Sequence, residues 1–320
     1  MHKLLSASAL ILLLGGMLSV SGRQEALATS NPRQDHHQRA SAQNTLTRLT
    51  IVFPTRRDSV DLQNKANAVA QFLSKQIGIP VDAVVADETA AVEALRANRA
   101  DVAFLSSRPA LKAEQLAGAR LVLAEVRPDY SGGHTYNSVL VVRKDSPLRP
   151  QGSKKQTLQQ LKGKRIAFAS RTSGSGFIIP IGEFVGAGLI DGPDRLENFF
   201  SQVTYGDGYS SALQAVLRGQ ADVAAVSEYA LNPPWITAQE AEQLRVLQEF
   251  PGVPAHGIVI DDDVPAAMRD KIVNALLKLN DSANNGLLRA LYNSTSLVKV
   301  NHDSHLAPMR QAMQRARIQP

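Results

Sequence analysis

Short apolar runs alternate with longer segments of helical periodicity from residue 46 onward. Apolar positions at helical spacing predict a helix over Leu62–Ile77, and Gly78 just beyond it is typical of a helix end. Apolar runs followed by turn residues predict buried strands over 46–53, 81–85 and 100–105, with a second helix over 88–98. This order predicts parallel strands covered by helices, and ligands bind beyond the carboxyl ends of such strands.

A second stretch repeats this succession. The segments AVEALRANRADVAFLSS (91–107) and ALQAVLRGQADVAAVSE (212–228) share a helix, a short turn, Ala-Asp-Val-Ala and a polar end. The echo predicts two related lobes whose strand ends face one cleft; chance similarity between helix-turn-strand segments is the alternative. The other predicted strands are 137–143, 165–169, 203–205, 221–226, 244–249 and 257–260, and the other predicted helices are 158–162, 210–218, 265–282 and 305–315.

The stretch KRIAFASRTSGSGFIIP (164–180) predicts a strand, a polar loop and a helix that starts at Phe177. The loop contains Ser173, Gly174, Ser175 and Gly176. Free backbone N–H groups at a helix N-terminus, with hydroxyl donors beside them, favour an oxyanion. An ordinary turn with a helix cap is the alternative for the same residues.

The first residues have the pattern of an export signal. Lys3 precedes an apolar run over 4–14, and Ala26-Leu27-Ala28 has the form of a cleavage site, so residues 1–28 are predicted to be a signal peptide. A retained anchor is the alternative, although the run is short for a bilayer. Residues 29–45 are polar and predict a flexible linker, whose His36-His37 pair lacks the spaced partners of a metal site.

Composition narrows the class of ligand. The chain has 320 residues, 44% of them hydrophobic, which is enough for two lobes, and it has no cysteine and hence no disulfide. The formal charge of +6 comes from scattered residues and aromatics make up only 5%, so a small anion is favoured over nucleic acid. Walker, dinucleotide-binding and paired metal-ligand motifs are missing, which predicts no cofactor and no metal.

Polar residues at the predicted strand ends form the rest of the candidate binding set. Glu228 is the most informative, because a carboxylate at the end of an apolar strand is costly to bury without a partner. With the loop over 173–176, the set predicts a two-lobed clamp on a small polar ligand. Its members outside that loop are Thr55, Arg56, Ser106, Ser107, Tyr136, Tyr209, Glu228 and His256.

The run LQQLKGKRIAFASRTSGSGFIIP (158–180) resembles the signature of the phosphonate- and phosphite-binding proteins of ABC importers. Segments 87–107 and 210–231 resemble the helix-strand blocks of that family, and the resemblance covers roughly residues 47–295. It implies an α/β, two-lobed periplasmic-binding-protein fold of type II, with a mainly parallel sheet flanked by helices in each lobe and the ligand in the cleft. The implied lobes are 46–138 plus 255–320, and 139–254.

The resemblance also implies roles for single residues. The loop over 173–175 would hold the phosphonyl oxygens, and Tyr136 and Tyr209 would line the site. His256 stands where the family commonly has a second acid, which weakens the attraction for an ammonium arm. We therefore expect phosphite, methylphosphonate or phosphate as the ligand, with Glu228 accepting a hydrogen bond from a protonated P–OH group.

The implied function is that of an exported solute-binding protein that delivers this ligand to an ABC permease. We expect a periplasmic monomer without enzymatic activity, without a cofactor and without a nucleic-acid partner. Two alternatives stay open. One is an exported hydrolase that uses Ser175 with His256 and Glu228, although nothing in their spacing supports a triad. The other is a sensory module for another organic anion, such as a sulfonate.

Overall fold

The computed structural model describes residues 46–55 and 61–320, all within one compact unit, Thr45–Pro320. The predicted signal peptide and linker, and the candidate Arg56, lie outside the described residues. Among the described residues, no helix is both long enough and apolar enough to cross a membrane.

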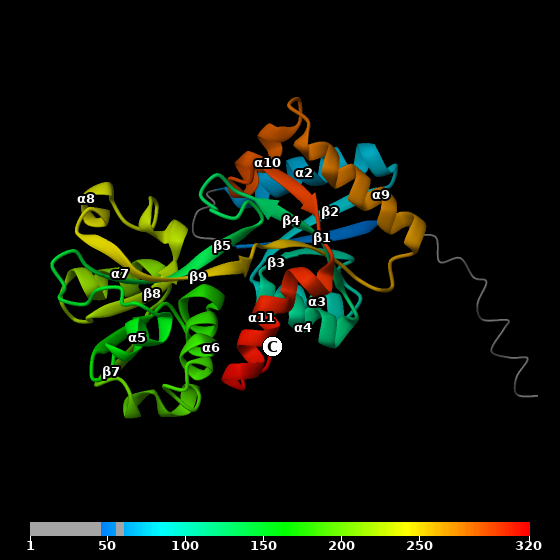
Figure 1. Ribbon diagram of the computed structural model, residues 1–320. Helices are drawn as coiled ribbons and strands as arrows, with labels where there is room; N and C mark the ends of the chain where they lie inside the picture. The colour runs from blue at the N-terminus through cyan, green and yellow to red at the C-terminus, as the bar shows by residue number, and fades with distance from the viewer. Residues whose placement is uncertain (1–45, 56–60) are drawn as a thin grey trace, which may run out of the picture. The chain divides into compact units, whose positions relative to one another are not determined.

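The first sheet has the strand order β11-β4-β10-β3-β1-β2 (Figure 1). β1 pairs in parallel with β2 and β3, whereas β10 runs antiparallel between β3 and β4, and β11 runs antiparallel to β4 at the edge. The strands are β1 (Leu49–Pro54), β2 (Val81–Ala86), β3 (Val102–Leu105), β4 (Arg120–Val126), β10 (Gly257–Ile260) and β11 (Ser296–Lys299).

The second sheet has the strand order β7-β6-β8-β5-β9. β6 pairs in parallel with β7 and β8, and β5 runs antiparallel between β8 and β9. The strands are β5 (Thr135–Arg143), β6 (Arg165–Phe168), β7 (Gln202–Tyr205), β8 (Val223–Ser227) and β9 (Leu244–Pro254).

The two sheets repeat one arrangement. In each, the first strand of a βαβαβ unit is flanked by the second and third strands, and an antiparallel strand adjoins the third. The echoed segments 91–107 and 212–228 take equivalent places, since they hold α3 with β3 and α7 with β8. The sequence echo therefore reflects a structural repeat.

Helices flank both sheets, as Figure 1 shows for α2, α9 and α10 on one face of the first sheet and α3 and α4 on the other. The α-helices are α2 (Leu62–Ile77), α3 (Glu88–Arg96), α4 (Ser107–Ala117), α5 (Lys154–Gln159), α6 (Ile179–Gly186), α7 (Tyr209–Leu217), α8 (Ala238–Ala241), α9 (Ala266–Leu277), α10 (Asn285–Tyr292) and α11 (His302–Ala316). The other helical turns are η2 (Gly174–Ile178), η3 (Pro193–Asn198), η4 (Glu228–Leu231) and η5 (Lys278–Asn280).

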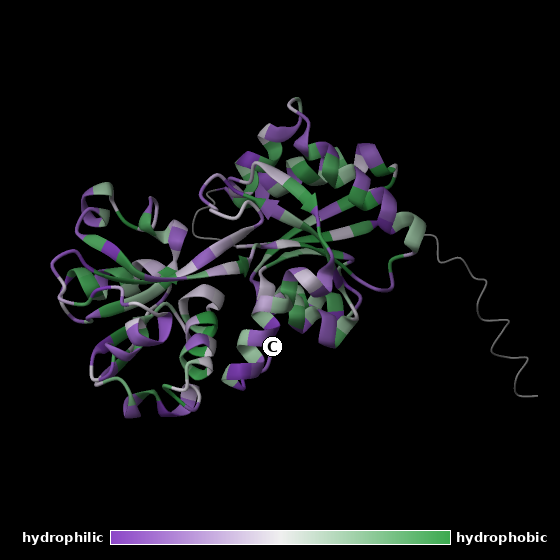
Figure 2. Cartoon of the chain, in the orientation of Figure 1, coloured by the Kyte–Doolittle hydropathy of each residue, from purple (hydrophilic) through white to green (hydrophobic). Residues whose placement is uncertain are grey.

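Apolar side chains of the sheets and helices form the buried core. Figure 2 colours the cartoon by residue hydropathy and shows apolar residues along the strands and helices. One cluster joins β1 and β3 to α2, α9 and α10, and another joins β5 and β8 to α7. A third cluster is continuous from Leu105 and Leu121 of the first sheet to Phe168 of the second. Each buried Leu, Ile or Phe contributes about 1.5–3 kcal/mol, so these clusters fix the strand ends that carry the site.

The C-terminal helix α11 packs against α6 at a close crossing. Gly182 of α6 lies against Ala312 of α11, and a Cβ at Gly182 would come within 2.9 Å of the Ala312 Cα. A glycine lets two helix backbones approach to this degree because it has no side chain to separate them. α11 follows β11 of the first sheet, and α6 follows β6 of the second sheet. The crossing therefore connects helices that belong to different sheets.

The predicted α/β fold with two helix-flanked sheets is confirmed, and most strands of each sheet run in one direction. Both sheets are mixed, because β5 and β10 each arrive from the other sheet and insert antiparallel beside the third strand. α4, β4, α8, α10 and β11 were not predicted from the sequence. α4 carries a proline in its first turn, and Leu111 is the one large apolar side chain among its buried residues. The predicted lobe boundaries stay a prediction.

Candidate functional site

A cavity of about 290 Å³ lies where chain segments leave the carboxyl ends of strands in both sheets. Segments that follow β2, β3, β4, β6, β7 and β8 contribute to its wall, as expected for ligand sites in α/β sheets. The lining residues are Glu88, Ser106, Ser107, Arg108, Arg127, Tyr136, Ala169, Ser170, Thr172, Ser173, Gly174, Gly208, Tyr209, Tyr229, Trp235 and His256.

Three helix N-termini open onto this cavity. The lining includes the residues that precede α4, η2 and α7, which are Ser106, Ser173 and Gly208. A helix N-terminus carries a partial positive charge of roughly half an elementary charge, together with backbone N–H groups that lack partners within the helix. Three of them around one small volume favour an anion.

Two arginines add full positive charges to the wall. Arg127 is only 6% exposed; its Nε donates to Oδ1 of Asp129 at 3.2 Å, and its guanidinium lies 5.5 Å from the ring centroids of Tyr130 and Tyr229. Arg108 in the first turn of α4 donates from Nη2 to the Gln319 carbonyl at 3.3 Å, and its buried Nε has no hydrogen-bond partner among the described residues. Burial lowers the pKa of Arg108, but a guanidinium stays charged at any ordinary pH.

Aromatic rings form another part of the wall. Tyr229 packs against Tyr136 and Tyr209 at centroid distances of 5.3 and 5.7 Å, and Trp235 meets Tyr209 edge-on at 5.2 Å. Burial raises the pKa of Tyr136 and of Tyr229 well above the ordinary value, so both phenols stay neutral and can donate hydrogen bonds. The wall therefore combines apolar ring faces with neutral donors.

The Ser/Gly loop is the first turn of a helix rather than a loop before one. The chain enters a π-helical turn at Gly174, and Ser173 caps it by accepting a hydrogen bond from the Gly176 N–H at 3.0 Å. Ser173 and Gly174 line the cavity, whereas Ser175 and Gly176 are buried beneath it. The Ser175 hydroxyl is hydrogen-bonded to the Tyr209 hydroxyl at 2.7 Å. Ser175 thus lies behind the wall that it was predicted to form.

Glu228 and His256 lie in different surroundings. The Glu228 carboxylate accepts hydrogen bonds from the Ser131 N–H and hydroxyl, both at 2.9 Å, and does not line the cavity. η4 starts at Glu228, and this turn directs the side chain to the segment between β4 and β5. His256 does line the cavity, and its Nδ1 lies 3.0 Å from Oε1 of the buried Glu125. In this structure the Glu228 carboxylate is thus bound by Ser131, and its contact with the ligand stays a prediction.

Ser106 and Ser107 line the cavity, but Ser106 is already engaged. Its N–H donates to Oε1 of Glu88 at 2.6 Å and its hydroxyl donates to Oε2 at 2.9 Å. Thr55 is exposed and is not in the wall. The structure thus brings together seven of the predicted residues, namely Ser106, Ser107, Tyr136, Ser173, Gly174, Tyr209 and His256.

The predicted binding set does not contain five residues of the wall, namely Glu88, Arg108, Arg127, Tyr229 and Trp235. Glu88 and Arg108 could have been found, because both come within three residues of a predicted strand end. Arg127 directly follows β4, which the sequence analysis did not recognise. Trp235 lies well beyond its strand and gave no local signal.

The proposed hydrolase residues each have other contacts. Ser175 is fully buried and bonded to Tyr209, His256 lies on Glu125, and Glu228 accepts from Ser131. A triad needs the serine bonded to the histidine and the histidine to the acid. That arrangement is not formed here.

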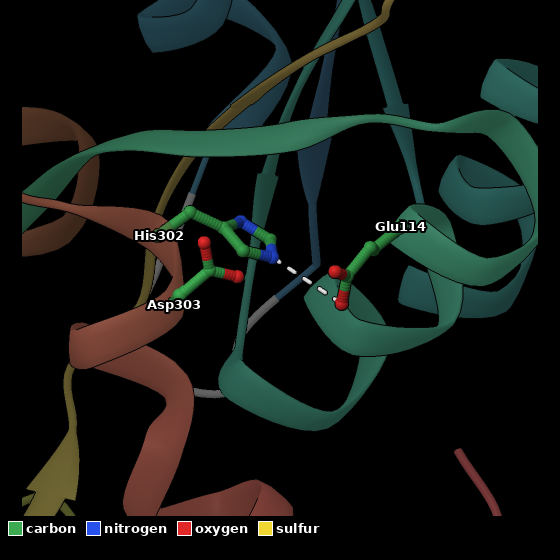
Figure 3. A group of neighbouring side chains, drawn as sticks. All are labelled: Glu114, His302 and Asp303. Carbon is green, nitrogen blue, oxygen red and sulfur yellow. Dashed lines mark ion pairs between the residues drawn. The ribbon is translucent and has the colours of Figure 1, made fainter.

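A separate group of Glu114, His302 and Asp303 has its ligand atoms within 4.8 Å of one another (Figure 3). Nδ1 of His302 accepts the Leu121 N–H at 2.8 Å, so the neutral ring carries its proton on Nε2, which faces Glu114 at 3.3 Å. Arg310 donates to Glu114 at 3.0 Å, and Arg120 donates to Asp303 at 2.7 Å. These contacts make the group an ion-pair network between α4 and α11.

The family described as "ABC transporter, phosphonate, periplasmic substrate-binding protein" matches residues 51–306. The chain belongs to this family. It is 26% identical over 244 residues to the Phosphonates-binding periplasmic protein of Escherichia coli (strain K12), covering 75% of this chain and 68% of that protein. It is 24% identical over 223 residues to the Phosphate-import protein PhnD of Mycolicibacterium smegmatis, covering 69% of this chain and 64% of that protein.

A solved structure shares the fold. PhnD1 from Prochlorococcus marinus, determined in complex with methylphosphonate, aligns with a TM-score of 0.65 at 17% identity, covering 85% of this chain and 98% of that chain. As a member of the phosphonate family, this chain is a substrate-binding component of an ABC transporter. The family resemblance predicted from the sequence is confirmed.

Proposed function

We propose that this family member captures a small phosphorus oxyanion in the cavity and delivers it to the transmembrane permease of an ABC importer. The observation that carries the proposal is the convergence of three helix N-termini with Arg108 and Arg127 on one small volume. The relatives named for phosphonate, phosphate and methylphosphonate support a phosphorus-containing ligand.

The cavity supports a small ligand. Its volume of about 290 Å³ is at the lower end of ligand sites. Arg127 already lies over the Tyr229 ring, so an ammonium arm would meet a resident cation there. Phosphite, methylphosphonate and phosphate therefore fit the proposal better than an aminoalkyl phosphonate.

The proposal includes export to the periplasm after removal of residues 1–28, a monomeric protein and no turnover of the ligand. It also includes lobes of 46–138 plus 255–320, and 139–254, that close on the ligand. The chain passes from one sheet to the other near Arg127 and again near His256, and both residues line the cavity. The lobes would hinge at these two connections, so a bound ligand would contact the hinge directly.

Calorimetry of the mature protein tests the ligand. We expect saturable one-to-one binding of phosphite, methylphosphonate or phosphate, with weaker binding of aminoethylphosphonate and taurine. The same solutions, analysed for products after incubation, should contain only the starting ligand. Absence of binding for all the phosphorus oxyanions would refute the assignment, and formation of product would favour the hydrolase.

A further inference from the structure

Among the described residues that line the cavity, Glu88 is the one acidic side chain. It is the first residue of α3, two residues beyond β2. Its Oε1 accepts the Ser106 N–H at 2.6 Å and its Oε2 accepts the Ser106 hydroxyl at 2.9 Å. These two bonds hold the carboxylate in place beside the N-terminus of α4.

An ionised carboxylate can only accept hydrogen bonds, and its two oxygens offer about four lone-pair sites. Ser106 uses one site on each oxygen, which leaves acceptor capacity on both. The other charged groups in the wall, Arg108 and Arg127, are donors, as are the backbone N–H groups of the helix N-termini. An oxyanion in the cavity therefore meets donors on several sides and an acceptor at Glu88.

We propose that Glu88 is a specificity-determining residue that accepts a hydrogen bond from a P–OH group of the ligand. The inference rests on the proposed function and names the ligand class more closely, as a phosphorus oxyanion that keeps one acidic proton. A sulfate or sulfonate has no such proton at neutral pH, so its oxygens would face the Glu88 carboxylate without a hydrogen atom between them. Repulsion of this kind rejects a ligand of equal size and shape.

The groups around Glu88 support this reading. The charge of Glu88 reaches the cavity. The pKa of Tyr136 in the wall is raised first by burial, then by the nearby Tyr209 and Glu125, and also by Glu88. The other titratable or charged groups of the wall are Arg108, Arg127, His256, Tyr209 and Tyr229. An adjoining cavity shares Glu88 and adds Glu93 and Lys112.

The test compares methylphosphonate with methanesulfonate, which match in size but differ in having an ionisable P–OH. Dissociation constants are measured by calorimetry from about pH 5 to 9. This range includes the second ionisation of phosphoryl groups, at about pH 6. We expect the wild-type protein to bind methanesulfonate at least tenfold more weakly. We also expect its affinity for methylphosphonate to fall as the ligand loses its last proton. A pH-dependent change in the charge of the cavity wall affects both ligands, so the ratio of the two constants isolates the P–OH contact.

The variant Glu88→Gln keeps an acceptor for Ser106 and adds an amide donor toward the ligand. It should bind methanesulfonate more tightly and lose most of the pH dependence for methylphosphonate. Glu93→Gln is the matched control, since it removes the same charge from the same helix at a residue paired with Arg96. That variant should keep the wild-type ratio.

Equal wild-type affinity for the two ligands would overturn the role of Glu88, and so would an unchanged ratio in Glu88→Gln. The wild-type comparison needs no variant, so a folding defect in Glu88→Gln leaves the proposal open to refutation. Binding of neither ligand would instead refute the proposed function on which the inference rests. The two failures are thereby distinguished.

Discussion

At the scale of residues, the guanidinium of Arg127 is held in place by its neighbours, which suits the anion binding that we propose. Asp129 holds one edge of its guanidinium, and Tyr130 and Tyr229 lie near its faces. A planar, always charged group held in this way loses little further freedom on binding. The same arrangement predicts that lysine would be a poor replacement at this position.

Replacing Arg127 by alanine should weaken binding of the phosphorus oxyanion by roughly tenfold to a hundredfold, because a hydrogen bond to a charged group is worth about 1.5–3 kcal/mol. Arg127→Lys should recover only part of the loss, since lysine cannot form the paired contact with Asp129. Arg171→Ala is the control, because Arg171 also lies over a tyrosine, 4.0 Å from the Tyr205 ring, but not in the cavity wall. Similar losses in both alanine variants, measured by calorimetry, would argue against a specific role for Arg127.

Asp261 carries a buried charge outside the cavity wall. Burial, with the nearby carboxylates of Asp262, Asp263 and Asp101, raises the pKa of Asp261 from 3.8 to about 6. The folded protein thus binds this proton more tightly than the unfolded chain, so the free energy of unfolding falls as the pH rises from 3.8 to about 6. Above that range the full penalty remains.

Asp261→Asn keeps the acceptor for the Asp262 N–H and removes the charge. We expect it to raise the free energy of unfolding by about 1–2 kcal/mol at pH 8, with little gain at pH 4. Urea denaturation at the two pH values measures the difference. Asp270→Asn, at an exposed position of α9, should show no such pH dependence. A stabilisation of equal size at both pH values would contradict the linkage argument.

At the scale of elements, the crossing of α6 and α11 depends on a residue that has no side chain. Two glycines four residues apart on α6 face α11 differently. A Cβ at Gly182 would lie 2.9 Å from the Ala312 Cα, whereas a Cβ at Gly186 would lie 3.7 Å from the Arg315 side chain. Only the first contact is too short for an added methyl group.

Gly182→Ala should therefore destabilise the protein by about 1–3 kcal/mol, as overpacking does. Gly186→Ala should be neutral or stabilising by up to about 1 kcal/mol, because alanine is the better helix former and finds ordinary contact distances. Thermal or urea denaturation of both variants provides the comparison. Equal effects would show that helix propensity rather than the α6–α11 contact controls stability here.

Local patterns predicted the elements whose signals are contained within the element. α2 begins and ends as predicted, and the echoed segments lead to equivalent places in the two sheets. The antiparallel insertion of β5 and β10 could not be predicted in this way, because it depends on pairing with strands far along the chain. The site followed the same rule: strand-end residues such as Ser106 and Tyr136 reach the cavity.

Side-chain direction is what the sequence left undetermined. Ser175 belongs to the most distinctive stretch of the chain, yet the π-helical turn directs its hydroxyl to Tyr209. The cost of burying a carboxylate predicts Glu228 in the cavity, whereas in the structure its side chain is only partly buried and accepts hydrogen bonds from Ser131. Such choices depend on neighbours that the sequence does not place.

At the scale of the whole molecule, the cavity and the connections between sheets share residues. Arg127 and His256 both lie on segments that pass from one sheet to the other, and both line the wall. A bound ligand would therefore contact both connections. Because it binds the folded protein, it would also stabilise that protein against unfolding. At a ligand concentration of about 100 times the dissociation constant, the added stability would be about 2.7 kcal/mol.

Trp235, packed edge-on against Tyr209 in the cavity wall, is the one tryptophan of the chain. Its emission therefore comes from a single indole at the site, and the protein carries its own optical reporter of occupancy. We expect phosphite or methylphosphonate to change the intensity or wavelength of that emission, with a midpoint equal to the calorimetric dissociation constant. An iodide titration should quench the indole less strongly in the occupied protein. Emission that stays constant through saturation would indicate that the ligand binds away from this wall.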